Sequence, residues 1–203
     1  MKKIGITGTI AAGKTTVSIL LKRYGFPVFN SDQYSRLALR SGTPTYDAVV
    51  KEFGTDILAE DGEVDRAALA AVVFSDEEKR KKLNSIVHPF VIEGMNRFFE
   101  NHSDLPLVFA EVPLLYECGL ESYFDEVCVV TCTKETAAER MMEERGYTRE
   151  EAENRYASQI SQNEQVTKAD TVIHNDGDLQ ELNSEVRKWV RTLREQVRNG
   201  CKN

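Results

Sequence analysis

The sequence lacks an excess of basic residues. Lysine and arginine number 26 against 33 aspartates and glutamates, which gives a formal net charge of −7. Because binding along a nucleic-acid backbone is driven by clustered cations that neutralise phosphates, this balance argues against a protein that coats nucleic acid. It leaves open a small anionic ligand, which needs only a local basic pocket.

Long hydrophobic runs are also missing. An apolar stretch follows Lys2 and Lys3, as in a signal peptide, but Gly5 and Thr7 interrupt it and Lys14 follows soon after. No other run approaches the length that spans a bilayer. We therefore expect a cytoplasmic protein without a membrane partner.

The cysteines form no C-x-x-C pair, and the three histidines are too scattered to complete a zinc site. Two of the cysteines lie in the apolar run 127–132, which has the character of a buried strand. We expect reduced thiols that pack as small hydrophobic side chains. The cysteines are Cys118, Cys128, Cys132 and Cys201, and the histidines are His88, His102 and His174.

The chain has 203 residues, of which 41% are hydrophobic and 29% charged. This size and balance are typical of a soluble globular protein with one core and a small appended subdomain. Residues 3–7 and 27–30 have the pattern of buried strands, and a helix between them ends at Gly25, so the start of the chain predicts a βαβ unit. Further strands are expected at 105–111, 126–131 and 171–174. This alternation predicts a three-layer α/β/α fold with a parallel sheet.

Residues 32–102 interrupt this alternation with an almost wholly helical pattern. Helices are expected at 32–39, 45–53, 66–74, 76–86 and 89–101, a helix pair rich in arginine within 134–162, and a last amphipathic helix at 179–197. We therefore expect a nucleotide-binding core formed by 1–31, 103–133 and 163–203, a helical substrate-binding insert at 32–102, and a short helical lid at 134–162.

Residues 8–15 match the phosphate-loop pattern G-x-x-x-x-G-K-[ST] between a predicted strand and a predicted helix. Glycines let successive backbone amides turn toward phosphate oxygens, and the following helix presents its positive dipole end to the same anion. Lys14 is expected to reach the β- and γ-phosphates, and the Thr15 hydroxyl to bind Mg²⁺. The predicted nucleotide site consists of Gly8, Ala11, Ala12, Gly13, Lys14, Thr15 and Thr16.

A GTP-dependent switch protein is a rival interpretation of a phosphate loop. Residues 167–170 read T-K-A-D, which is similar to a guanine-reading motif. However, the chain contains no D-x-x-G sequence to sense the γ-phosphate, and the T-K-A-D segment precedes a predicted strand instead of following one. These two observations argue against the switch.

Asp32 follows the second predicted strand, at the edge of the sheet where ligands bind in open α/β folds. Its carboxylate is suited to accept a proton from an attacking hydroxyl. Aspartate is equally favoured as the N-cap of the helix that follows. The spacing alone supports both roles.

Several segments taken together resemble the dephospho-CoA kinase family, over roughly residues 3–190. Residues 5–16 resemble its opening motif, residues 30–36 its D-A-D-x-x-x-R segment, and residues 112–117 its P-L-L-[FY]-E motif. The insert resembles the family in F-G at 53–54, I-L at 57–58, D-G at 61–62, D-R at 65–66 and I-V-H-P at 86–89. The remaining matches are Arg140, Arg145, Arg155 and Gln159 at the spacing of its lid, and K-A-D at 168–170 with Ile173 and Asn175.

The chain departs from the family pattern in two places. The usual G-G-I-G-S-G-K-[ST] loop carries Thr9 and Ala11 in place of two glycines, which predicts a stiffer loop and at most an altered nucleotide affinity. The first acid of D-A-D is Asn30, which leaves Asp32 as the one carboxylate of that segment able to act as a base.

The resemblance implies ATP- and Mg²⁺-dependent phosphorylation of the ribose 3′-hydroxyl of dephospho-CoA, the last step of coenzyme A synthesis. It implies Asp32 as the general base, Lys14 as the phosphate clamp, and Arg140 as a cation that closes over the transferring group. Thr15 would bind Mg²⁺, and Arg145 and Asn175 the nucleotide. Glu111, at the end of a predicted strand, is suited either to orient a Mg²⁺-bound water or to be a surface charge, and a surface charge is also an alternative for Glu117. Substrate contacts would come from Asp32, Arg36, His88, Leu114, Glu117 and Arg140.

Alternatives remain at this stage. His88 precedes Pro89 and is also suited to a helix entry with its ring in the core. Another P-loop kinase, acting on a nucleoside or small metabolite, is the alternative function, although the predicted insert is larger than a small acceptor needs. We expect only the small molecules ATP and dephospho-CoA as partners, no nucleic acid, and a monomer or weak homo-oligomer.

Overall fold

The structure, a computed structural model, describes residues 1–74 and 76–200, so Cys201 lies outside the described residues. The chain separates into two compact units. Met1–Phe29 and His102–Asn203 form the first, here called the core unit, and Asn30–Asn101 form the second, here called the insert.

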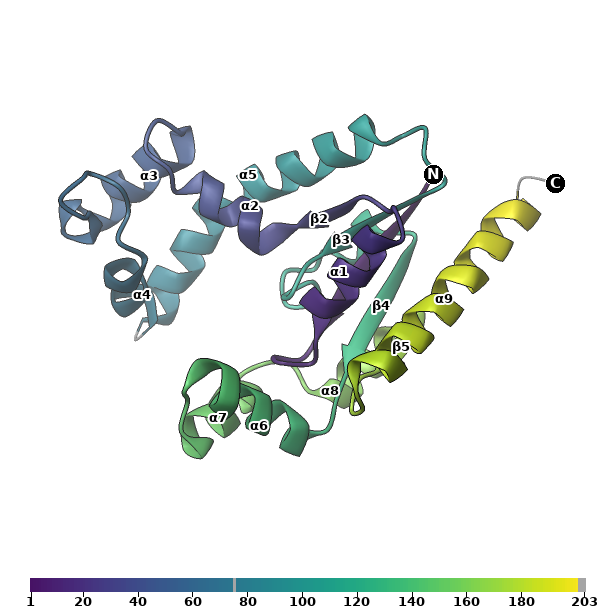
Figure 1. Cartoon of the computed structure of the whole chain (residues 1–203). Coiled ribbons are helices and arrows are strands. Elements are labelled where there is room, and N and C mark those ends of the chain that lie inside the picture. The colour runs from purple at the N-terminus through teal and green to yellow at the C-terminus, as the bar shows by residue number, and fades with distance from the viewer. Residues whose placement is uncertain (75, 201–203) are drawn as a thin grey trace. The chain divides into compact units, whose positions relative to one another are not determined.

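The core unit is built on a five-stranded sheet in the order β2-β3-β1-β4-β5 (Figure 1). β1 pairs in parallel with β3 and β4, and β4 pairs in parallel with β5. The predicted parallel α/β fold is confirmed, with strand bounds at most two residues from those expected. The strands are β1 (Lys2–Gly8), β2 (Val28–Asn30), β3 (Leu107–Glu111), β4 (Glu126–Thr131) and β5 (Thr171–His174).

Side chains alternate between the two faces of the sheet, as the two-residue period of a strand requires. Ile4 and Ile6 of β1 belong to the main apolar core. The backbone of Gly5 faces Leu115 and Phe124, because a Cβ built there would lie 2.8 Å and 3.1 Å from their side chains. The segment after β3 therefore packs closely on the second face of the sheet.

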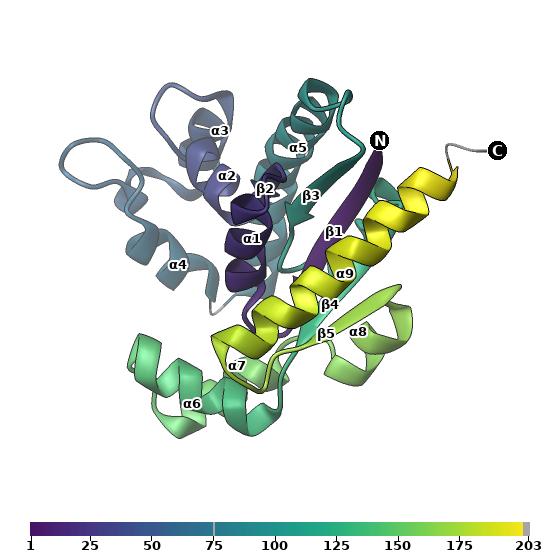
Figure 2. The ribbon, with the colours of Figure 1, turned by 45° about the vertical axis from the view of Figure 1, so that its right-hand side comes forward.

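The helices of the core unit follow the strands in the expected order. The last helix places Leu182, Val186, Trp189 and Leu193 in the main core, and Figure 2 shows it lying along the sheet. This helix also contacts the first one. The helices are α1 (Lys14–Arg23), α6 (Lys134–Arg145), α7 (Arg149–Ala157), α8 (Gln162–Lys168) and α9 (Leu179–Gly200).

Helix α8 is an element that the sequence prediction missed. Its N-cap is Ser161, whose side chain accepts a hydrogen bond from the Glu164 amide at 3.2 Å. Ser161 and Glu164 stand at the S-x-x-E spacing that marks helix starts, so a signal was present. The helix has only seven residues, too few for a clear apolar period.

The insert contains α2 (Ser31–Ala38), α3 (Pro44–Phe53), a 3₁₀ turn at Thr55–Ile57, α4 (Arg66–Phe74) and α5 (Glu77–Asn101). Helix α5 contacts the other three helices. The prediction of two helices, 76–86 and 89–101, was wrong, because α5 runs through Pro89. A proline inside a helix removes one backbone hydrogen bond, and packing against three neighbouring helices outweighs this local cost.

Candidate active site

The phosphate loop follows β1, the central strand of the sheet, and leads into α1. Gly8 has a φ of 144° and Gly13 a φ of 95°. A Cβ on Gly8 would lie 2.0 Å from the carbonyl oxygen of Val130, and one on Gly13 would lie 2.2 Å from Nδ2 of Asn175. Both positions therefore require glycine, for backbone conformation and for space.

Ala11 has a φ of 59°, and no other non-glycine residue in the described chain has a positive φ. It occupies a position where the family usually has glycine. The left-handed region costs an L-residue about 1–2 kcal/mol. Ala11 therefore adopts the left-handed conformation that the loop needs, at a modest cost in stability, although glycine is the residue favoured there.

Three predicted residues meet beside the loop. The Lys14 ammonium donates hydrogen bonds to the carbonyl oxygens of Gly8 at 2.9 Å and Thr9 at 2.8 Å. The Thr15 hydroxyl donates to Oε1 of Glu111 at 2.8 Å. Glu111 ends β3 opposite Ile6 of β1, and only 3% of its surface is exposed. The sheet register thus places a buried carboxylate next to the first turn of α1.

Arg140 and Asn175 also lie against the loop. The Arg140 guanidinium donates to the carbonyl oxygens of Ala11 at 3.3 Å and Asn175 at 2.9 Å. The Asn175 side chain donates from Nδ2 to the carbonyl oxygen of Ala12 at 2.8 Å. Helix α6 and the end of β5 are therefore tied to the phosphate loop, and Asn175 supports its backbone.

Gln159 is a loop contact to which the sequence analysis gave no role, although it appeared in the lid resemblance. Its side-chain oxygen accepts a hydrogen bond from the backbone amide of Ile10 at 2.7 Å. That amide belongs to the set of donors that a phosphate loop turns toward anions. Gln159 therefore connects the segment after α7 to the phosphate loop.

Other predicted residues lie at the surface of the core unit. Leu114 is 44% exposed, and Arg145 and Glu117 are also exposed. Neither of these two charged side chains forms a hydrogen bond with the phosphate loop within the described residues. Thr16 is half-buried in the first turn of α1. Ligand contacts by these four residues remain predictions.

The N-cap of α2 is Asn30, so the N-cap role considered for Asp32 was wrong. Oδ1 of Asn30 accepts a hydrogen bond from the amide of Gln33 at 2.8 Å. Asp32 lies in the first turn of the helix with an exposed side chain. Asparagine caps a helix as well as aspartate does, which explains how the chain tolerates Asn30 in place of the usual acid.

Asp32 lines a pocket of about 340 Å³ within the insert, here called the Asp32 pocket. Ser35, Arg36 and Arg66 add polar groups to its wall. The pocket thus brings together Asp32 and Arg36, two residues predicted to contact the substrate. Its apolar wall is formed by Leu39, Leu69, Ala70, Val73 and Leu83.

His88 lies inside α5, so the alternative of a helix-entry residue was wrong. The side chain is half-buried, and burial lowers the pKa of its imidazole below the usual value. Burial therefore favours the neutral form of the ring. A neutral ring offers a substrate a hydrogen bond, without a positive charge.

The T-K-A-D segment that favoured a GTP switch has structural contacts instead. Oδ2 of Asp170 accepts a hydrogen bond from the amide of Val127 in β4 at 2.8 Å. The Lys168 ammonium lies 2.9 Å from Glu164 and 5.5 Å from the ring centre of Tyr116. The first contact ties the segment before β5 to β4, and the other two hold Lys168 against Glu164 of α8 and the Tyr116 ring, so both charged residues have partners without a guanine base.

A parallel sheet, a phosphate loop between β1 and α1, and a helical insert with a carboxylate-lined pocket define a P-loop enzyme that transfers phosphate to a small molecule. The family model for dephospho-CoA kinase matches residues 2–181. The chain belongs to the dephospho-CoA kinase family, which confirms the family predicted from the sequence motifs. This family transfers a phosphoryl group from ATP to dephospho-CoA.

Individual relatives agree with this assignment. A dephospho-CoA kinase of Bacillus cereus is 43% identical over 192 residues, which cover 92% of this chain and 96% of the relative. The crystal structure of TT1252 from Thermus thermophilus is 35% identical, with a TM-score of 0.81 over 94% of this chain and 96% of that one. Dephospho-CoA kinase from Campylobacter jejuni is 25% identical, with a TM-score of 0.71 over 93% and 95%.

Two features are absent from residues 1–74 and 76–200. Neither α5 nor α9, nor any shorter helix described, is long and apolar enough to cross a membrane. Within the same residues, no three histidine, cysteine, aspartate or glutamate side chains gather as a metal site.

Proposed function

We propose that this chain phosphorylates the ribose 3′-hydroxyl of dephospho-CoA with ATP, and that Asp32 is the general base. The observation that carries this proposal is the Asp32 pocket, which combines a carboxylate, guanidinium groups and an apolar wall. An acceptor that is a nucleoside with an anionic substituent matches this combination. A carboxylate within reach of the hydroxyl is the group that phosphoryl transfer needs on the acceptor side.

The core unit carries the groups that act on the donor. Phosphoryl transfer depends mainly on positioning and on stabilising charge at the transferring group. Lys14 would leave the carbonyl oxygens of Gly8 and Thr9 to bind the β- and γ-phosphates. Arg140 of α6, whose guanidinium donates a hydrogen bond to the carbonyl oxygen of Ala11, would add a second positive charge beside the phosphates.

We also propose that Thr15 and Glu111 serve a magnesium ion. A hydroxyl and a carboxylate oxygen are hard ligands of the kind Mg²⁺ prefers, and these two are joined by a 2.8 Å hydrogen bond. Magnesium held there would neutralise negative charge on the phosphates of ATP. Thr15 would hold the ion, and Glu111 would hold the Thr15 hydroxyl in place.

The function is tested by measuring ADP release with dephospho-CoA, adenosine, AMP and shikimate as acceptors. We expect release to depend on dephospho-CoA, and mass spectrometry and NMR to locate the new phosphate on the ribose 3′-oxygen. Activity confined to adenosine, AMP or shikimate would favour the alternative of another small-molecule kinase. ADP release that needs no acceptor would contradict a kinase.

Replacing Glu111 with glutamine is expected to raise the Mg²⁺ concentration for half-maximal activity about 10-fold or more. The amide can still accept the Thr15 hydrogen bond but no longer supplies a negative charge near the ion. The measurement is a Mg²⁺ titration of activity at saturating ATP. Glu139→Gln, an exposed change on α6, is the control. An unchanged Mg²⁺ requirement in Glu111→Gln would refute the proposed role of Glu111 at the magnesium ion.

We further infer that the protein acts in the cytoplasm on small molecules alone, as a monomer or weak homo-oligomer. Cys128 and Cys132 are free thiols, which supports a reducing compartment. Burial raises the pKa of the Cys128 thiol well above its usual value. This thiol therefore stays protonated and packs as an apolar group.

A further inference from the structure

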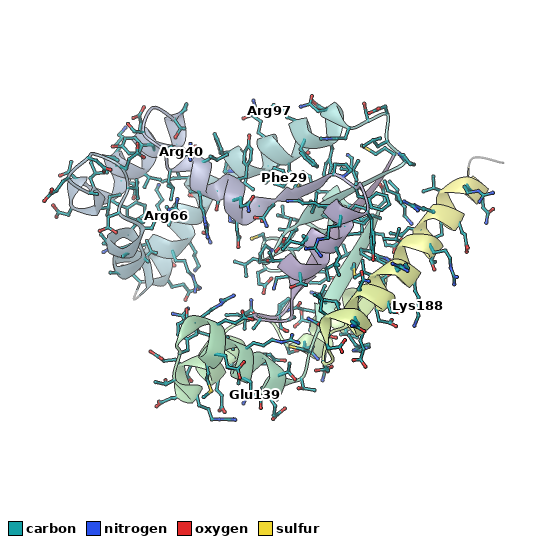
Figure 3. All side chains as sticks on the ribbon, in the orientation of Figure 1. Phe29, Arg40, Arg66, Arg97, Glu139 and Lys188 are labelled. Carbon is teal, nitrogen blue, oxygen red and sulfur yellow. The ribbon has the colours of Figure 1, made fainter. Side chains whose placement is uncertain are left out.

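A second pocket of the insert adjoins the Asp32 pocket. It has a volume of about 410 Å³ and is here called the arginine pocket, because Arg36, Arg40 and Arg66 line it. Figure 3 labels two of them, Arg40 and Arg66, in the same region of the insert. Arg36 and Arg66 line both pockets, so these two side chains mark where one pocket meets the other.

The arginine pocket is strongly positive in a chain of net charge −7. Three guanidinium groups line it against one carboxylate, that of Glu63, which leaves two positive charges. None of the three guanidinium groups forms an ion pair or hydrogen bond with another described residue. Their donors are available to an anion, and guanidinium is the side-chain group best shaped to bind phosphate oxygens.

The segment that carries Arg40 is held in place at both ends. Thr43 caps α3 by accepting a hydrogen bond from the Tyr46 amide at 3.1 Å. Its hydroxyl lies 2.6 Å from the carbonyl oxygen of Ala38 and 3.0 Å from that of Arg40. One side chain thus joins the end of α2 to the start of α3, and it fixes the backbone of Arg40 between them.

Arg66 is held in a similar way at the start of α4. Oδ1 of Asp65 accepts hydrogen bonds from the amides of Ala67 at 2.8 Å and Ala68 at 3.2 Å. The turn before it is anchored by Tyr46, whose hydroxyl donates to the carbonyl oxygen of Gly62 at 2.5 Å. The backbone that presents Arg66 is therefore ordered before any ligand binds, which lowers the entropy lost on binding.

We propose that Arg40 and Arg66 complete, together with Arg36, a site for the diphosphate of the acceptor. This inference rests on the proposed function. Asp32 and Arg36 are four residues apart on α2 and so share one face, with their Cβ atoms about 5–6 Å apart. In a nucleoside 5′-diphosphate ester, the reacting 3′-hydroxyl and the diphosphate belong to one ribose. The general base Asp32 and the anion site at Arg36 are close enough to serve the 3′-hydroxyl and the 5′-diphosphate of one ribose.

Charge and surface agree with this arrangement. A diphosphate diester carries two negative charges, which balance the two uncompensated positive charges of the arginine pocket. The apolar wall of the Asp32 pocket suits a purine base. The diphosphate held by Arg40 and Arg66 would fix the nucleoside in that pocket, so these two residues determine specificity for an acceptor that carries a diphosphate.

The test compares Arg40→Gln and Arg66→Gln with Arg80→Gln, a change of an exposed arginine on α5 that lines neither pocket. For Arg40→Gln and Arg66→Gln, we expect the KM for dephospho-CoA to rise about 10- to 100-fold, with kcat within a few-fold of wild type. The inhibition constant of adenosine, which lacks the diphosphate, should stay unchanged. Thermal unfolding and the KM for ATP report whether each variant is folded.

Three outcomes would count against the proposal. A KM for dephospho-CoA that shifts no more than in Arg80→Gln would refute the diphosphate site while leaving the proposed function intact. An equal rise in the KM for dephospho-CoA and the inhibition constant of adenosine would show a general distortion of the pocket. A wild-type protein inactive with dephospho-CoA would contradict the proposed function, and this inference with it.

Discussion

Replacing Asp32 with asparagine is expected to lower kcat for dephospho-CoA by about 10²- to 10⁴-fold. The amide keeps the size of the side chain but cannot take a proton from the ribose hydroxyl. The N-cap of α2 is Asn30, so the substitution leaves the capping hydrogen bond in place and should change stability little. The measurement is steady-state kinetics of ADP release, together with ATP binding by calorimetry.

Asp56→Asn provides the matched control for this result. Asp56 is an exposed aspartate of the same insert, in the 3₁₀ turn, and it lines neither pocket. It should retain full activity. ATP affinity should be unchanged in both variants, because the nucleotide groups belong to the core unit. If Asp32→Asn kept activity within a few-fold of wild type, another group or water itself would have to accept the proton.

Replacing Lys14 with methionine is expected to lower kcat/KM by about 10²- to 10³-fold. The ammonium supplies positive charge and three donors to the β- and γ-phosphates, and methionine of similar length supplies neither. In the structure this ammonium donates to the carbonyl oxygens of Gly8 and Thr9. We therefore expect a small loss of stability as well, which thermal unfolding would measure separately from the kinetics.

Lys22→Met is the control, since Lys22 is an exposed lysine in the last turn of the same helix. Its kinetics should match those of the wild type. Lys14→Arg should regain part of the lost activity, because it restores the charge but in a larger, planar group. Full activity in Lys14→Met would show that the phosphate loop does not bind the donor in the predicted way.

The sheet and the phosphate loop were predictable because their signals are local. Strands 126–131 and 171–174 are short apolar runs, and their observed bounds equal the predicted ones. The phosphate loop depends on backbone conformations at Gly8 and Gly13 that few other residues adopt, so its pattern is rarely met by chance. Lys14 and Thr15 then occupy fixed places relative to the loop.

The insert was less predictable because packing decides its details. Pro89 predicted a helix end, but contacts with three other helices keep α5 continuous. Asp32 and Asn30 are equally good helix caps, so residue type alone does not predict which of them is the N-cap of α2. Arg40 and Arg66 meet Arg36 in one pocket, although Arg66 lies 30 positions after Arg36 in the chain. No local pattern marks such a meeting.

The place where the insert joins the sheet has an evolutionary consequence. The insert leaves the core unit after β2 and returns before β3, and these two strands are neighbours in the sheet. Because the sheet is parallel, the end of β2 and the start of β3 lie at its opposite edges, so the insert connects two fixed points, and the loop-closure entropy of such a segment rises only slowly with its length. Segments of other lengths and sequences can be exchanged at this point while the sheet and the phosphate loop stay unchanged. The acceptor can thus diversify independently of the donor.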